Sequence, residues 1–354
     1  MILARTRKEV ITLFLFVFML NLVNIASAAI VFKSNRNGLS DIYVMNDNGT
    51  NVTQLTNTPF WDTSPRWSPD GKHIIFMRDL GPVSEPRQLQ QLDIFIIDAD
   101  GNNEKRLTFH PKNDGFPTWS PDGQHIAFTS TRIGHGEIHI LEIASGNIRQ
   151  LTENEEGIAY SSTPSWSPDG QHIVHEQVIA GGGRHIYITD VDGKNTRPFL
   201  KGDQPHRIDD MVISKYTPHW SPDGRHVLYY ESHKKYEDAR VVRLANHLIV
   251  VDKNGKNPMK LKIPESWWIG IANWAKNGTQ IVFSALPDGI DEQGRAKNKL
   301  NIYRYHISTG KITQITDTPN HKDSSPDWTP HSLAVSPKGK LGLQWGVVKM
   351  ITIR

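Results

Sequence analysis

The chain has no cysteine, little net charge and only one long apolar run. Without cysteine there is no disulfide, no thiolate zinc site, no cysteine nucleophile and no lipid-modified cysteine. Any metal would need histidine, carboxylate or carbonyl ligands. Lysine and arginine total 40 against 37 aspartates and glutamates, a balance that gives no electrostatic footprint for nucleic acid. A chain of 354 residues is long enough for one large barrel-like or propeller-like domain.

The apolar run lies at the N-terminus and is typical of a signal peptide. Three basic residues precede it, residues 10–26 are mostly Leu, Phe, Val and Ile, and Ala26-Ser27-Ala28 is a small-x-small cleavage pattern. A retained membrane anchor is the alternative, but a span needs about 20 apolar residues and two asparagines interrupt this run. We therefore expect residues 1–28 to be removed. The mature chain would then be periplasmic or extracellular, with no stable membrane insertion.

A five-residue string, Trp-Ser-Pro-Asp-Gly, occurs four times, and two partial copies follow it. The six strings begin at Trp67, Trp119, Trp166, Trp220, Trp274 and Trp328. They are 47 to 54 residues apart, which suits one four-stranded propeller blade per repeat.

Each repeat predicts four strands in the same order. The Asp-Gly pair favours a tight hairpin after the first strand, and an apolar second strand follows, as at residues 73–76. A third strand such as residues 93–96 leads to a second glycine turn. The short fourth strand ends in a Leu-Thr signature, as at residues 106–108. No helical period interrupts this order.

The two ends of the chain predict how the ring closes. Residues 30–32 match a second strand with no first strand before it, whereas residues 325–328 match a first strand with no blade after it. We therefore predict an all-β, six-bladed β-propeller of four-stranded antiparallel blades over residues 29–330, closed by N- and C-terminal strands that share one blade. The predicted blades are residues 30–56 with 326–330, then 65–108, 117–152, 164–200, 218–262 and 272–316.

Residues 331–354 are predicted to form a C-terminal extension beyond the closing strand. Two stretches of it, 333–337 and 341–348, are too apolar for a simple tail. They would pack across a propeller face or contact a partner.

These repeats resemble those of the TolB-like (WD-type) beta-propeller family, most clearly at residues 65–76 and 117–128. The resemblance implies the propeller fold. TolB is a periplasmic protein that binds a peptidoglycan-associated lipoprotein, and it carries an additional α/β domain ahead of its propeller. Only about 30 residues precede the first strand here, so the resemblance covers the propeller alone. Related propellers accompany prolyl-oligopeptidase-like peptidases, but the sequence has neither a Gly-x-Ser-x-Gly elbow nor a hydrolase domain.

The repeated residues are explained by structure, so function is sought where the repeat is broken. In a propeller, the first-to-second and third-to-fourth strand turns share one face, which we call the hairpin face. The second-to-third and blade-to-blade connections share the other, the loop face. Here the loop-face connections are long and irregular, with insertions at 79–92, 232–245 and 285–299.

We expect a non-enzymatic, exported binding module that recognises a protein or cell-envelope ligand through the loop face. We assign it no cofactor, no metal, no catalytic residue and no nucleic-acid partner, and we expect a monomer. Aromatic, histidine and arginine side chains in these connections are the candidate binding residues. They are Phe60, Trp61, Phe109, His110, Tyr160, His206, Arg207, Trp267 and Trp268.

For the two aromatic pairs and for one basic segment of the loop face, an alternative to ligand binding stays open. One member of each pair, Phe60-Trp61 and Trp267-Trp268, would equally well pack on a neighbouring blade. The basic segment 233–243 suits either an anionic partner or a solvated loop, since nearby carboxylates largely neutralise it.

An enzyme is the alternative function. It would be a metal-dependent propeller lyase or hydrolase that acts on a polysaccharide or small substrate at the channel mouth. Its ligands would come from histidines outside the repeat, although no pair of them has a diagnostic spacing. These are His110, His206, His219, His233 and His321.

Overall fold

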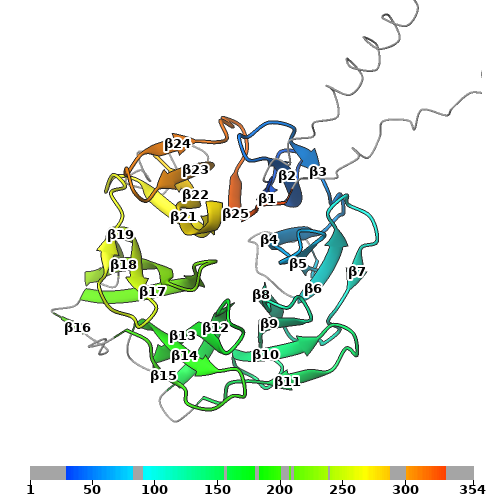
Figure 1. Ribbon diagram of the computed structural model, residues 1–354, viewed down its shortest axis with the longest axis horizontal. Helices are drawn as coiled ribbons and strands as arrows, with labels where there is room; N and C mark the ends of the chain where they lie inside the picture. The colour runs from blue at the N-terminus through cyan, green and yellow to red at the C-terminus, as the bar shows by residue number, and fades with distance from the viewer. Residues whose placement is uncertain are drawn as a thin grey trace, which may run out of the picture.

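The computed structural model describes residues 29–82, 91–154, 158–179, 183–200, 207–208, 211–237, 240–287 and 300–331. The predicted signal peptide, residues 1–28, and the extension beyond His331 lie outside the described residues. In the described part of the chain, the strands form six antiparallel sheets arranged as a ring (Figure 1). The six-bladed propeller predicted from the repeats is thus confirmed.

The blades follow one another in chain order, and the strand that carries the repeat tryptophan lies innermost in each (Figure 1). Blade 1 contains β25 (Asp323–Thr329), β1 (Ala29–Ser34), β2 (Asp41–Asn46) and β3 (Thr53–Gln54). Blade 2 contains β4 (Trp61–Trp67), β5 (His73–Asp79), β6 (Leu92–Asp98) and β7 (Lys105–Arg106). Blade 3 contains β8 (Asp114–Trp119), β9 (His125–Ser130), β10 (Glu137–Glu142) and β11 (Ile148–Gln150).

The second half of the ring has the same plan with additions. Blade 4 contains β12 (Ile158–Trp166), β13 (His172–Ile179), β14 (Arg184–Asp190) and β15 (Arg197–Pro198). Blade 5 contains β16 (Arg207–Ile208), β17 (Met211–Trp220), β18 (His226–Glu237), β19 (Arg240–Asp252) and β20 (Met259–Lys260). Blade 6 contains β21 (Trp268–Ala275), β22 (Gln280–Leu286), β23 (Asn301–His306) and β24 (Ile312–Gln314), with the 3-10 turn η1 (Lys276–Gly278) between its first two strands.

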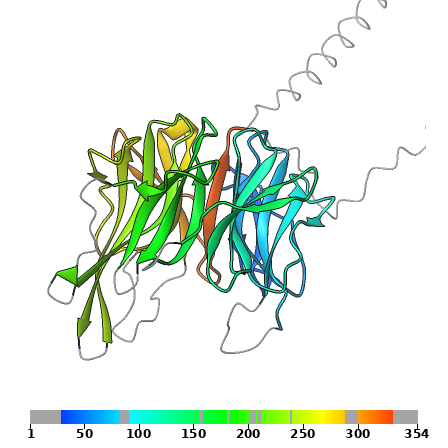
Figure 2. The ribbon, with the colours of Figure 1, turned by 90° about the horizontal axis from the view of Figure 1, so that it is seen from below.

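Blade 5 departs from the prediction in two ways. It has a fifth strand, β16, which pairs with the start of β17. The predicted loop insertion at 232–245 is also wrong, because β18 and β19 continue their pairing out to Glu237 and Arg240. In Figure 2 these yellow-green strands extend below the ring. Charged residues obscure the strand pattern in the sequence, since strands that project past the packed blades tolerate charge on both faces.

The first strands begin several residues earlier than predicted, because each contains a bulge. In blade 2, pairing with β5 shifts register between Thr63 and Arg66, and Ser64 has a φ of 52°. Phe116, Thr163, Thr217 and Ser325 repeat this left-handed conformation in other blades. Proline, which lacks an N–H, follows each of these residues. In blade 2 the regular pairing therefore skips Ser64 and Pro65 and resumes at Arg66, directly after the proline.

The hydrophobic core is divided among the blade junctions. In the described residues, six clusters of buried side chains each join two neighbouring blades. Trp67, for example, packs with Ile42 and Val44 of blade 1. The Trp274 indole N–H donates to the carbonyl of His219 in the preceding blade at 2.8 Å. The repeated tryptophans fill space between blades, as predicted.

The rest of the repeated string builds the hairpin that follows it. The Ser68 hydroxyl donates to Asp70 Oδ1 at 2.7 Å and accepts the His73 N–H at 2.9 Å. Gly71 completes the turn with a φ of 68°, a conformation that favours glycine. The same contacts recur in blades 3, 4 and 5. Packing and turn geometry therefore account for the repeated string.

The ring is closed by strands from both ends of the chain. β25 pairs with β1 from Ala29↔Thr329 to Ser34↔Asp323. Asp327 in β25 also accepts the Trp67 N–H of blade 2 at 2.8 Å. The predicted shared blade is confirmed. It holds strands from both ends of the chain and links them to the two neighbouring blades.

Candidate functional site

The predicted binding residues lie at successive blade junctions around the loop face. Phe60 and Trp61 lie at the start of β4, Phe109 and His110 lie between blades 2 and 3, and Trp267 and Trp268 lie at the start of β21. Tyr160 is in β12, and Arg207 begins β16, where its backbone pairs with Val212. His206 lies outside the described residues. The described residues of this set are spread over five blade junctions and do not form one cluster.

The aromatic residues differ in how much surface they offer. Phe109 is 72% exposed, and the Arg106 guanidinium lies 4.9 Å from its ring centre. Trp267 instead packs against Tyr303, with ring centres 4.8 Å apart, so it supports blade 6. Phe60, Trp61 and Trp268 are half-buried. Phe109 is therefore the most accessible of the predicted anchors.

Blades 1 to 3 close their loop-face ends with one repeated arginine–aspartate unit. Arg36, Arg78 and Arg132 each donate to both carboxylate oxygens of the aspartate that stands five residues before the repeat tryptophan. Arg78 does so through Nε and Nη2, and the other two arginines through Nη2 alone. The carboxylates, Asp323, Asp62 and Asp114, are fully buried. Each guanidinium also lies over aromatic rings of its own blade. In each of these three blades the guanidinium thus neutralises one buried carboxylate.

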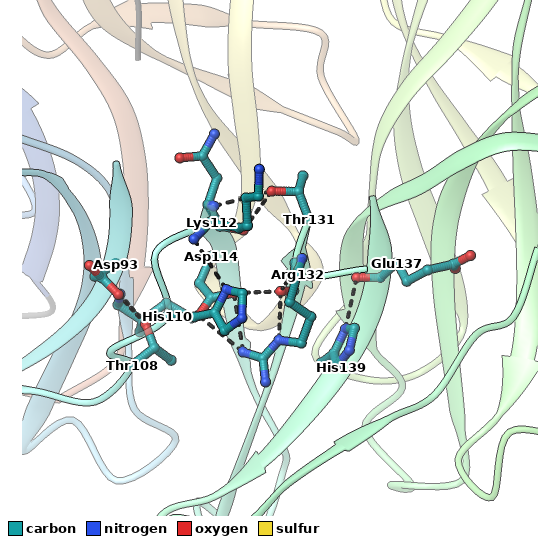
Figure 3. A network of polar contacts seen from close by, with 12 residues as sticks. Asp93, Thr108, His110, Lys112, Asp114, Thr131, Arg132, Glu137 and His139 are labelled. Atoms are coloured by element: carbon teal, nitrogen blue, oxygen red, sulfur yellow. Dashed lines mark hydrogen bonds and ion pairs between the residues drawn. The ribbon is translucent and has the colours of Figure 1, made fainter. Parts of the chain in front are cut away.

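Figure 3 shows this unit in blade 3 with its surroundings. His110 lies beside the Arg132–Asp114 pair, and its Nδ1 accepts the Lys112 N–H at 3.1 Å. Burial lowers the pKa of the adjacent His139, and Arg132 lowers it further. His110 is therefore part of a corner that it shares with Lys112 and Arg132.

Blades 4 and 5 replace this unit with a different cluster. The corresponding positions hold Ser161 and Lys215 instead of aspartate. Arg184 lies between two tyrosines, 5.3 Å from the Tyr160 ring and 5.0 Å from the Tyr216 ring. Sequence reasoning singled out only Tyr160 of this group.

Glu176 and Lys234 complete the tyrosine–arginine cluster, which we define as Tyr160, Glu176, Arg184, Tyr216 and Lys234. Glu176 is buried and bonds Arg184 Nη1 at 2.8 Å, the Thr217 N–H at 2.7 Å and the Thr163 hydroxyl at 2.8 Å. Lys234 Nζ donates to the Tyr216 hydroxyl at 3.0 Å and lies 5.6 Å from that ring. The two positive charges of Arg184 and Lys234 exceed the single negative charge of Glu176, so the cluster has a net positive charge.

The opposite, hairpin face holds the mouth of the central channel. A cavity of about 300 Å³ there is lined by residues of all six blades. The residue before each tryptophan contributes, and among these Arg66 faces Asp327 and His219. Burial lowers the pKa of His219 well below its usual value, and Arg66 adds to this effect. The residue before each repeat tryptophan varies from blade to blade. This variation was the sequence signal for the residues that line the cavity, and sequence reasoning missed it.

The histidines of the enzyme alternative are scattered. His219 is half-buried in β17, His233 pairs with Glu231 at 2.8 Å, and His321 lies in the loop before β25. Among the residues that the structure describes, no three His, Asp or Glu side chains gather as a metal-binding group. Over the same residues, no helix is long and apolar enough to cross a membrane.

The fold, the repeated hairpins and the shared closing blade define a six-bladed propeller built from WD-type repeats. Residues 83–262 match the family model described as the TolB beta propeller domain. This match covers half of the chain, so the chain belongs to the TolB beta propeller domain family.

Individual relatives agree with this assignment. An uncharacterized protein of Agrobacterium fabrum is 31% identical over 204 residues, covering 54% of this chain and 62% of that protein. The Tol-Pal system protein TolB of Francisella tularensis subsp. mediasiatica is 32% identical over 210 residues, 58% of this chain and 43% of that protein. The crystal structure of TolB from Acinetobacter baumannii has a TM-score of 0.61 at 16% identity, covering 85% of this chain and 66% of that one. The chain therefore spans about half the length of its curated relatives.

Proposed function

We propose that this chain is a non-enzymatic, exported binding module that recognises a protein or cell-envelope ligand through its loop face. One observation carries the proposal: the arginine–aspartate unit of blades 1 to 3 gives way to the tyrosine–arginine cluster in blades 4 and 5. Where residues differ from the shared pattern of a repeat, they do not serve its common packing role. Binding sites are commonly found at such positions.

The chemistry of the cluster favours an acidic ligand. Tyrosine and arginine are the side chains most often found as binding anchors. Glu176 satisfies Arg184, whereas the Lys234 ammonium donates to a neutral hydroxyl, so it retains its attraction for an anion. The projecting β18–β19 hairpin brings Lys234 to the loop face.

The relatives add support for an envelope role. The Francisella relative is named a Tol-Pal system protein, and this chain covers 43% of it. A periplasmic or extracellular location and a monomeric state belong to the same proposal.

Affinity capture tests this proposal. The mature chain, residues 29–354, would be used to capture binding components from an envelope and culture extract of the native host, identified by mass spectrometry. The loop-face variants Lys234→Ala and Phe109→Ala should each reduce recovery of a specific component by about ten-fold if they remove binding anchors.

Matched controls come from the hairpin face. Lys72 is an exposed lysine in the β4–β5 hairpin, and Val52 is 39% exposed beside β3. Lys72→Ala and Val52→Ala should leave recovery unchanged. Equal recovery by all four variants, or loss only in the hairpin-face pair, would contradict a loop-face site.

Metal analysis tests the enzyme alternative separately. Stoichiometric metal in the purified protein, lost when two of the five non-repeat histidines are changed, would establish a metal-dependent propeller enzyme and overturn the proposal.

A further inference from the structure

A second surface lies on the hairpin face, at the junction of blades 2 and 3. A cavity of about 740 Å³ there has an apolar floor that includes Ile96, Leu107 and Ile143. Its rim carries Asp70, Asp98 and Asp122. Lys105 is the single lysine at the rim, so the mouth is acidic around an apolar base.

The described chain ends beside this cavity. The imidazole Nε2 of His331 lies 3.1 Å from the Pro69 carbonyl. Pro69 and Asp70 form one wall of the cavity. Because an extended residue spans about 3.5 Å, the 23 residues beyond His331 are more than long enough to cross a cavity of about 740 Å³.

The sequence that follows His331 complements the cavity. Residues 332–354 contain no aspartate or glutamate, three lysines and one arginine. Leucine, valine and isoleucine residues and Trp345 lie between these cations. A basic, apolar segment fits an apolar floor with an acidic rim, both by burial of apolar surface and by charge.

We propose that residues 332–354 bind in this cavity of their own chain and cover the blade 2–blade 3 junction. The segment follows directly from β25, so its docking would add a second tie between the closing strand and blade 2. This inference concerns the hairpin face and stands independently of the proposed loop-face function.

Disulfide trapping in the full chain tests the docking directly, because the chain has no native cysteine. Ile143→Cys would be combined in turn with Leu333→Cys, Val335→Cys, Leu341→Cys and Leu343→Cys. A disulfide needs Cα atoms within about 7 Å. At least one pair should oxidise about ten-fold faster than the control pairs, because docking raises the effective thiol concentration.

Val191 provides the matched control position. Its N–H donates to the carbonyl of Gln171 just as the Ile143 N–H donates to that of Gln124, one blade earlier. Val191→Cys, paired with the same four cysteines, should remain largely reduced. Equal oxidation at both positions would overturn the proposal. Disulfide-linked dimers would overturn it too, since they would place the segment on a second copy.

The rim charges allow a second test in the best cross-linking pair. Adding Asp98→Asn and Asp122→Asn should slow disulfide formation several-fold, and salt should have a smaller effect on this variant than on its parent. Leu107→Cys replaces Ile143→Cys if the latter variant folds poorly. No change on removal of both charges would contradict charge-guided docking.

Discussion

At the scale of single residues, the buried arginine–aspartate pairs should matter much more than the exposed ion pairs. Arg78 and Asp62 are 5% and 0% exposed at their side chains, and Glu104 adds a second carboxylate. Burial raises the pKa of Asp62, although Arg78 opposes this effect. Removing one partner leaves a buried charge without a counter-charge and without access to water.

Asp62→Ala should therefore lower the free energy of unfolding by about 3 kcal/mol. Lys72→Ala, which removes an ion pair with 77% and 50% exposed side chains, should change it by less than about 0.5 kcal/mol. Urea unfolding monitored by tryptophan fluorescence measures both values. Similar losses in the two variants would show that burial does not set the strength of these pairs.

A buried histidine makes stability depend on pH. Burial lowers the pKa of His175 to about 4, and its Nε2 contacts the Thr189 hydroxyl at 2.8 Å. In the unfolded chain a histidine binds its proton near pH 6.5. Between these values the unfolded state holds more protons, so stability is complete above pH 6.5 and is lost as the pH falls toward 4.

Between pH 7 and pH 5, the unfolding free energy of the wild type should fall by about 2 kcal/mol more than that of His175→Gln. Unfolding curves at a series of pH values measure this difference. Parallel pH profiles for the two proteins would mean that His175 titrates normally in the folded state.

At the scale of elements, a threonine in the Leu-Thr or Ile-Thr signature holds the short fourth strand in blades 1, 2, 3 and 6. The Thr108 hydroxyl accepts the Ile94 N–H at 3.0 Å and donates to Asp93 at 3.1 Å. Thr56, Thr152 and Thr316 make corresponding contacts to the third strands of blades 1, 3 and 6. A strand of two or three residues makes few ladder bonds, so this side-chain link stabilises it.

Thr108→Val should lower the free energy of unfolding by about 2 kcal/mol, because it leaves the buried Ile94 N–H without its partner and removes one hydrogen bond of Asp93, which keeps only Arg106. Thr108→Ser keeps the hydroxyl and should cost much less. Thermal and urea unfolding of the pair distinguish the hydroxyl from the methyl group. A larger loss in the serine variant would assign the effect to packing.

Sequence reasoning succeeded for elements that carry a local signature. The Trp-Ser-Pro-Asp-Gly string marks a strand end and a hairpin together, so it located every blade. The bulge at Ser64 escaped, because residues as different as Phe116 and Thr217 occupy the same conformation elsewhere. The tyrosine–arginine cluster was predicted only in part. Tyr160 and the segment that contains Lys234 were singled out, but Arg184 and Tyr216 were not, because they meet only when neighbouring blades pack.

At the scale of the whole molecule, the ring depends on one strand from the far end of the chain. β25 supplies the inner strand of blade 1 and contacts blade 2 through Asp327. Without it, β1 would present an open edge to the channel, and the blade 1–blade 2 and blade 6–blade 1 junctions would both lose packing.

A chain ended after residue 322 should therefore lose its single cooperative unfolding transition. A chain ended after residue 331 retains β25 and should keep that transition. Differential scanning calorimetry of both chains tests the closure. A cooperative transition in the shorter chain, at the midpoint of the longer one, would show that β25 is dispensable.

The central claim is that the loop face of blades 4 and 5 binds an acidic ligand. The most direct measurement is the dissociation constant of the captured component for the wild type, Lys234→Ala and Lys72→Ala at low and high salt. The account predicts affinity about ten-fold weaker for Lys234→Ala alone, with a reduced salt dependence. Equal affinity in Lys234→Ala and the wild type, or weaker binding only in Lys72→Ala, would contradict it.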